Sequence, residues 1–90
     1  MKIAVDNQIS KAIVKSLIKK GFHIVLRAQD EQDEVWVDEA LMRGATHIVS
    51  PDIDIPNLLD RLDASDVVWI DVPRGYKKDK LENYLIGSLK

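Results

Sequence analysis

The 90-residue chain contains no cysteine. This absence excludes disulfide bonds, thiolate metal sites and cysteine nucleophiles, and it is typical of proteins from a reducing compartment. The chain also lacks an apolar run near the roughly 20 residues that a membrane-spanning helix needs. No apolar segment suited to export follows Met1. We therefore expect a cytoplasmic protein that does not enter a membrane.

An excess of basic charge is missing as well. The formal net charge is −2 and the isoelectric point is about 5.6, which argues against a protein that passively coats nucleic acid. It does not exclude an enzyme that holds metal ions beside carboxylates, because the ions reverse the local charge. The composition, 46% hydrophobic and 31% charged, is that of one globular domain over residues 1–90. So short a chain buries a limited core, so we expect a homodimer.

What the chain does contain is an alternation of short apolar runs and amphipathic segments. We expect strands at 2–5, 22–27, 46–50 and 66–71, helices at 8–20, 33–43 and 57–62, and a last helix marked by Leu81, Tyr84, Leu85 and Leu89. This order predicts an α/β fold in three layers, with a four-stranded, mainly parallel sheet, order 2-1-3-4, and helices on both faces. Strands that are apolar throughout favour burial of both faces.

Acidic residues follow the predicted strands. Asp6 ends the first strand, Asp33 begins the helix after the second, and Asp52 and Asp54 follow the third in "PDID". Parallel strands end at one edge of a sheet, so these acids should meet in a crevice there. Gathered carboxylates repel one another unless a cation such as Mg²⁺ or Mn²⁺ joins them. Such ions activate water against a phosphodiester, so the pattern is compatible with hydrolysis.

The same acids also have a purely structural interpretation. Asp6 or Asn7 can cap the helix that follows, and Asn57 can cap the short helix at 57–62. Asp52 and Asp54 can accept backbone N–H groups in a turn. Asp33 favours the first turn of its helix through the helix dipole. Residue types and spacing leave both interpretations open.

Three segments in order resemble small stand-alone proteins of the PIN-like superfamily. The first is "MKIAVDNQIS…LIKKGF", where a strand ends in an Asp and leads into a helix closed by Gly. The second is "QDEVWVDEAL", where Ala40 follows Asp33 by seven residues. The third is "SPDID", which supplies Ser50, Asp52 and Asp54. The resemblance covers residues 1–60, with departures at Ile55, where the family usually has Phe, and at Asn7 and Gln8.

The resemblance implies a PIN-like fold and a ribonuclease that uses Mg²⁺ or Mn²⁺. Asp6, Asp33, Asp52 and Asp54 would be the metal ligands and catalytic residues, and Ser50 and Asn7 would support them. Relatives of this kind cleave single-stranded RNA or flapped nucleic acid, and many are toxins held by an antitoxin partner. Two other classes stay open: an inactive binding or regulatory protein on the same scaffold, and a receiver-like domain in which an Asp accepts phosphate.

Basic and aromatic residues add further candidates. Arg27 ends the second predicted strand, and Arg74, Lys77 and Lys78 follow the fourth, with Lys80 nearby. All could contact phosphates, although the lysines also suit a solvated helix start. His47 is expected to pack, and His23 to lie at the end of the sheet away from the acids. Trp36 and Trp69 are expected in the core or an interface, and an exposed Trp36 would anchor a dimer.

Overall fold

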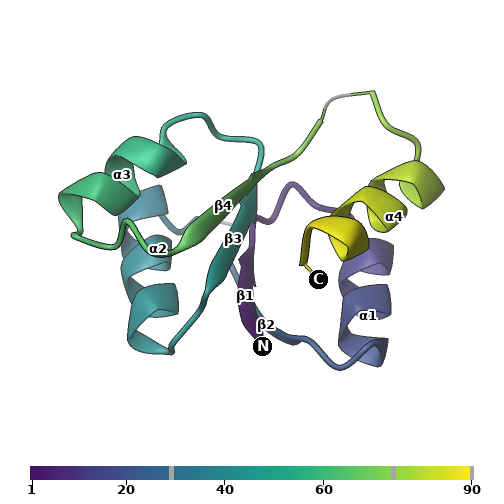
Figure 1. The fold of residues 1–90 in the computed structure, drawn as a ribbon, viewed down its shortest axis with the longest axis horizontal. Coiled ribbons are helices and arrows are strands. Elements are labelled where there is room, and N and C mark those ends of the chain that lie inside the picture. The colour runs from purple at the N-terminus through teal and green to yellow at the C-terminus, as the bar shows by residue number, and fades with distance from the viewer. Residues whose placement is uncertain (29, 74, 90) are drawn as a thin grey trace.

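The computed structural model describes residues 1–28, 30–73 and 75–89. Its elements are β1 (Lys2–Val5), α1 (Lys11–Lys19), β2 (His23–Leu26), α2 (Asp33–Met42), β3 (His47–Ser50), α3 (Ile55–Arg61), β4 (Val68–Asp71) and α4 (Lys78–Leu89). The four strands form one parallel sheet in the order β2-β1-β3-β4 (Figure 1). The expected strand order and direction are confirmed.

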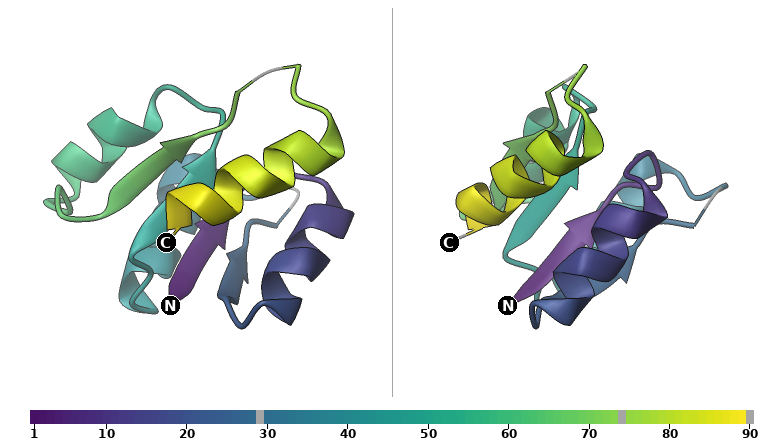
Figure 2. Two further views of the ribbon diagram at one scale, coloured as in Figure 1. Left: turned by 45° about the vertical axis from the view of Figure 1, so that its right-hand side comes forward. Right: turned by 90° about the vertical axis from the view of Figure 1, so that its right-hand side faces the viewer.

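The sheet separates two hydrophobic cores. Ala4, Val25 and Ile48 point toward α2 and α3, where they pack with Trp36 and Leu58. On the other face α1 and α4 cover a second core, and the hydroxyl of Ser16 on α1 donates to the carboxylate of Glu82 on α4. The views in Figures 1 and 2 show the sheet between these two helix pairs. The central strands β1 and β3 are buried on both faces, which explains why their sequences are apolar without alternation, whereas the edge strands β2 and β4 keep exposed residues.

The first helix begins later than the sequence pattern predicts. Helix α1 starts at Lys11 rather than Gln8, because Ser10 is the N-cap and its hydroxyl accepts a 3.3 Å hydrogen bond from the N–H of Ile13. The hypothesis that Asp6 or Asn7 caps this helix is therefore wrong, and the side chain of Asp6 is available for other contacts. The helix ends before Gly21, whose φ of 96° is readily adopted only by glycine.

Helix α3 also differs from its expected bounds. It begins at Ile55, two residues before 57, with Asp54 at the N-cap position and Pro56 in the first turn. Proline suits this position because its missing N–H has no partner there and its φ is already helical. Asn57 thus lies inside the helix and is not its cap. The earlier start places the helix directly after the acidic turn.

Trp36 is fully buried between α2 and the sheet, with 0% exposure. It is a core residue and is not exposed as a dimer anchor would be. Trp69 is partly buried against the same core, and His47 is partly buried in β3, as expected for packed side chains. Within the described residues, no helix has the length and apolar character that crossing a membrane requires.

Candidate functional site: a carboxylate pocket at the sheet edge

Asp6 is the centre of the site. It directly follows β1 and is 1% exposed, one of two polar residues among the buried residues of the described chain. Its Oδ2 accepts hydrogen bonds from the Ser50 hydroxyl at 2.8 Å and from Nη1 of Arg27 at 3.4 Å. Its Oδ1 accepts the backbone N–H of Gln8 at 3.2 Å. A buried carboxylate with three donors is held in one orientation by them.

The sheet register brings Ser50 to Asp6. Strands β1 and β3 are neighbours with Val5 opposite Val49, and the N–H of Asp6 donates to the carbonyl of Val49 at 2.9 Å. The next residue on each strand therefore points to the same side, toward α2. Ser50 is fully buried, and its Oγ also accepts the N–H of Asp52 at 3.1 Å. One hydroxyl thus fixes both Asp6 and the start of the "PDID" turn.

A tryptophan from the neighbouring strand supports the same turn. Nε1 of Trp69 on β4 donates to the carbonyl of Ser50 at 3.0 Å. This bond satisfies a carbonyl at the point where β3 leaves the sheet. The sequence placed Trp69 in the core or an interface, and it did not predict this contact.

Arg27 is the cation of the pocket. Its Nη1 forms ion pairs with Asp6, at 3.4 Å, and with Oδ1 of Asp33. Its Nε donates to the carbonyl of Glu31 at 2.8 Å, and its guanidinium lies 5.6 Å from the centroid of the Trp36 ring. These contacts hold the side chain across the mouth of the pocket, with 17% of it exposed. The sequence offered Arg27 as a candidate phosphate contact, and in the structure its guanidinium is paired with the acids.

The carboxyl groups of Asp33 and Asp52 interact with each other. The hydrogen bond between their carboxyl groups, with burial as a further cause, raises the pKa of Asp33 above its ordinary value. The same bond, together with the N–H of Asp54, lowers the pKa of Asp52. A proton is therefore retained more easily on Asp33, and Asp52 is the more readily ionised partner. We call Asp6, Asp33 and Asp52, with Ser50 and Arg27, the carboxylate pocket.

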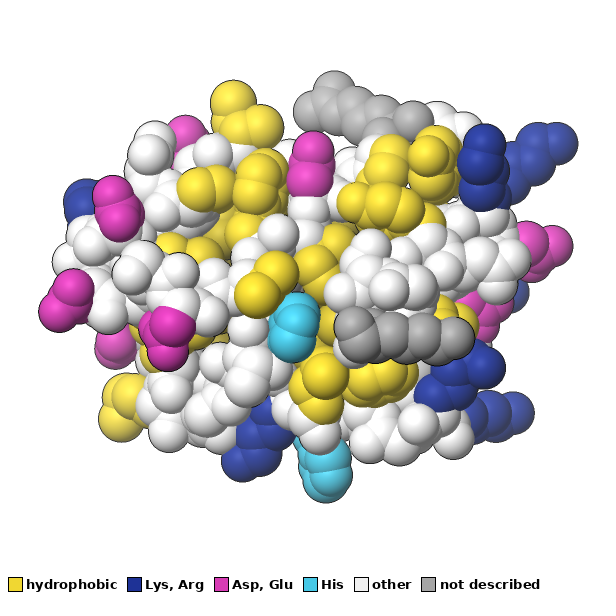
Figure 3. Space-filling view, viewed as in Figure 1, with side chains coloured by type: hydrophobic (Ala, Val, Ile, Leu, Met, Phe, Trp, Pro, Cys, Tyr) yellow, Lys and Arg dark blue, Asp and Glu magenta, His cyan; other side chains and the backbone are white. Residues whose placement is uncertain are grey.

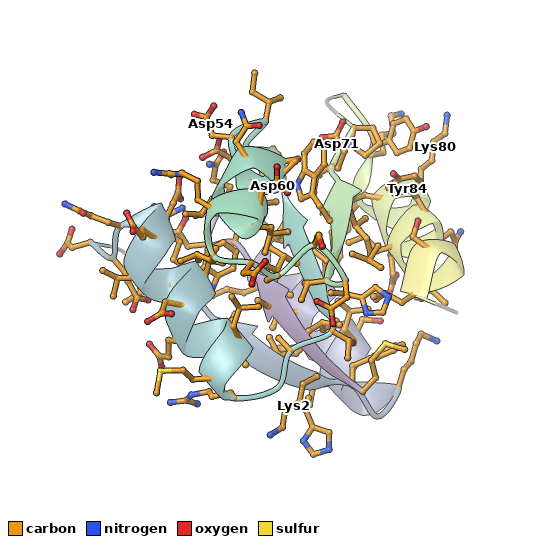
Figure 4. The ribbon with its side chains drawn as sticks, turned by 60° about the vertical axis from the view of Figure 1, so that its left-hand side comes forward. Lys2, Asp54, Asp60, Asp71, Lys80 and Tyr84 are labelled. Carbon is orange, nitrogen blue, oxygen red and sulfur yellow. The ribbon has the colours of Figure 1, made fainter. Side chains whose placement is uncertain are left out.

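Asp54 stays outside the carboxylate pocket. Its N–H donates to Oδ1 of Asp52 at 2.9 Å, the turn contact that the structural interpretation of "PDID" expects. Its exposed side chain lies at the start of α3, pointing outward in Figure 4. There it lines a hollow of about 440 Å³ together with Asp33, Asn57 and Arg61. Of the four predicted ligands, the structure brings three together and leaves the fourth across this hollow.

The remaining predicted residues have more distant roles. Nδ2 of Asn7 donates to the carbonyl of Ala28 at 3.5 Å, which braces the chain beside Arg27. Lys77 and Lys78 are exposed where α4 begins, and among the described residues no ion pair joins them to the acids. Nζ of Lys80 lies 4.6 Å from the centroid of the Tyr76 ring. Arg74 falls outside the described residues.

The donor chemistry and the charge of the pocket fit a divalent cation. All its ligating atoms are carboxylate or hydroxyl oxygens, which Mg²⁺ and Mn²⁺ prefer. If all three acids were ionised, as they would be around a metal ion, one guanidinium would leave two negative charges. As they stand, however, the described residues do not present three acids or histidines grouped to hold an ion. Arg27 lies between Asp6 and Asp33, and Asp33 is bonded to Asp52, so both contacts must open for an ion to enter.

No protein-family model matches the chain, and no curated protein or solved structure is significantly similar to it.

Proposed function

We propose that the chain is a PIN-like phosphodiesterase that cleaves RNA with Mg²⁺ or Mn²⁺ in the carboxylate pocket. The observation that carries this proposal is the convergence of Asp6, Asp33 and Asp52 from three separate segments. Acids that served only as helix caps or turn residues would not need to lie close to one another. The PIN-like assignment is supported by the strand order β2-β1-β3-β4 together with the acids at its carboxyl edge.

Each side chain has a distinct task in this proposal. Asp6, Asp33 and Asp52 would hold the ion, and Ser50 keeps Asp6 and the turn before Asp52 in place. A bound divalent ion supplies activated water and stabilises the negative charge that develops on the phosphate. Arg27, once released from the acids, is close enough to pair with a phosphate oxygen as a fork of donors. Its contact with the Trp36 ring can remain during this exchange.

The direct test is cleavage of an end-labelled single-stranded RNA. We expect cleavage with Mn²⁺, none with excess EDTA, and loss of at least about a hundredfold in rate for Asp52→Asn. The matched control is Asp60→Asn, an exposed acid on α3, which should keep wild-type activity. Activity that survives in Asp52→Asn would contradict the proposal, because it would come from another site or another protein.

A second candidate is supported by the ion pairs of Arg27. Because Arg27 already pairs with Asp6 and Asp33, these two acids have a cationic partner without a metal ion. The chain would then be a binding or regulatory module on the same scaffold, held by a protein partner or paired as a homodimer. Failure of Mn²⁺ to bind at all, with the fold intact, would favour this function over hydrolysis.

A further inference from the structure

A second surface feature reaches the carboxylate pocket from the opposite face of the sheet. It is a groove of about 340 Å³ between α1 and the edge strand β2. Its lining includes Ile9, Val14, Ile18 and Leu26, with Lys11 and Lys15 on the helix side. Ile18 is 53% exposed and Leu26 is 57% exposed, although both are large apolar side chains. The groove therefore has an apolar floor that is exposed to solvent, which is a feature of binding surfaces.

The cationic side of the groove has a regular spacing. Lys11 and Lys15 are one helical step of four residues apart, so they lie on one side of α1 about 6 Å from each other along the axis. Lys19 continues the same line at the end of the helix. All three are exposed. A row of this kind can follow successive negative groups of an extended ligand.

Charge is separated between the two helix layers. Residues 28–66, which include α2 and α3, contain 11 of the 15 acidic residues and two of the 13 lysines and arginines. The remaining residues carry the positive excess. Figure 3 shows this separation, with most acids over α2 and α3 and most lysines over α1 and α4. The net charge of −2 therefore hides a cationic layer that contains the groove.

The groove ends at the carboxylate pocket. Asp6 and Arg27, which belong to the pocket, also line the groove. Helix α1 begins near the carboxyl end of β1 and runs back along the sheet, so Lys11 lies at the pocket end of the groove and Ile18 at the far end. A chain bound along the lysines would therefore end at the sheet edge beside Asp6 and Arg27.

We propose that the groove between α1 and β2 binds single-stranded nucleic acid and leads it to the carboxylate pocket. The inference rests on the proposed function and names the path of its substrate. Phosphates pair with Lys11 and Lys15, and base faces pack on Ile18 and Leu26. A duplex is disfavoured because its base faces are stacked and covered. Lys77 and Lys78, the lysines expected from the sequence to bind phosphate, do not line this groove.

One other occupant fits the groove by charge. The outer face of α2 exposes Val35 and Met42 beside Glu34, Asp38 and Glu39, so a second copy of the chain could dock there. Because the two contacting faces differ, each pair of copies would still have one unoccupied groove and one unoccupied α2 face. Further copies could then add head to tail and form open chains. The nucleic acid is favoured because the groove is continuous with the acids. Self-association is an outcome that the experiment must detect.

The test measures binding of a fluorescently labelled 12-nucleotide single-stranded RNA by anisotropy in EDTA, so that cleavage plays no part. The variant Lys11→Glu/Lys15→Glu is compared with Lys77→Glu/Lys78→Glu, which changes the same charge at exposed positions where α4 begins. We expect the α1 pair to weaken binding by about tenfold or more and to reduce the slope against log salt by about two. The α4 pair should stay within about threefold of the unmodified chain.

The apolar floor is tested separately with Leu26→Gln, which leaves every charge unchanged and should weaken the binding of single-stranded RNA. Duplex RNA of equal length should bind poorly to the unmodified chain and to all variants. Equal losses in the two lysine pairs would overturn the proposal, because binding would then follow net charge alone. Absence of RNA binding together with salt-sensitive self-association that Lys11→Glu/Lys15→Glu abolishes would assign the groove to a second copy. RNA binding that depends on α1, without cleavage in Mn²⁺, would leave the groove standing and reject the proposed hydrolysis.

Discussion

The hydroxyl of Ser50 donates a 2.8 Å hydrogen bond to Oδ2 of Asp6 in the interior of the protein, joining the end of β3 to the end of β1. Oγ of Ser50 also accepts a hydrogen bond from the N–H of Asp52 at 3.1 Å. A hydroxyl side chain suits this position because one group must donate to a carboxylate and accept from the backbone. The order of the carboxylate pocket therefore depends on this side chain.

Ser50→Ala should destabilise the protein by about 1–3 kcal/mol, because it leaves a buried carboxylate oxygen and a backbone N–H with one partner fewer each. Urea unfolding followed by circular dichroism measures this loss. The control is Ser88→Ala on α4, where the exposed hydroxyl donates only to the carbonyl of Tyr84, and the change should stay within about 0.5 kcal/mol. Equal effects of the two substitutions would mean that Ser50 has no special role.

Arg27→Met should lower the free energy of unfolding in EDTA by about 3 kcal/mol, the low end for a buried ion pair because Arg27 is partly exposed. Asp6 and Asp33 would then lack their cation. Saturating Mn²⁺ should restore most of the loss in this variant, since a ligand that binds only the folded state stabilises it. Thermal unfolding with and without Mn²⁺ measures the rescue. Equal stabilisation of wild type and Arg27→Met by Mn²⁺ would show that the ion does not take the place of the guanidinium.

Trp69→Phe should cost about 1 kcal/mol, because the ring remains in the core while the indole donor to the Ser50 carbonyl is lost. Under the proposed function it should also slow RNA cleavage, since the turn before Asp52 loses a support. Unfolding and cleavage are measured on the same preparation. A stability loss with an unchanged rate would make Trp69 a core residue with no part in the site.

His47 gives the protein a pH dependence of known sign. Burial disfavours the imidazolium form and lowers the pKa of His47 below 6.5. The unfolded chain therefore takes up the proton first as pH falls, so the stability contribution is complete above pH 6.5 and is lost as pH drops from there through the folded pKa. His47→Gln should flatten the stability profile between pH 7 and 5 relative to wild type. An unchanged slope would assign the dependence to other groups.

The fold was largely predictable because its signals are periodic and local. Apolar strands separated by amphipathic segments predicted the parallel sheet. The order with β1 beside β3 was expected because it brings the acids at the strand ends together. Helix starts were less accurate. Ser10 and Pro56 are both residues that often mark a helix start. The spacing of hydrophobic residues nevertheless led us to expect α1 from Gln8, and the capping preference of Asn57 led us to expect α3 from that residue.

The sequence predicted which residues belong to the carboxylate pocket better than it predicted which of their side chains contact one another. Position at strand ends placed Asp6, Asp33 and Asp52 together, but which side chains touch one another depends on the register between strands. Arg27 follows Val25 by two residues and so points to the same face as that core residue, toward α2. This alternation was readable in the sequence and would have predicted the ion pairs. The Trp69 contact depends on the register of β3 and β4, which the sequence does not specify.

Acids from separate segments should together bind one divalent cation, and calorimetric titration with Mn²⁺ measures this binding. We expect saturable binding of one ion, weakened at least about tenfold by Asp6→Asn or Asp52→Asn and little changed by Asp54→Asn, whose side chain lies outside the carboxylate pocket. Binding that Asp54→Asn abolishes while Asp6→Asn preserves it, or no saturable binding in the wild type, would show that the carboxylate pocket does not hold the ion.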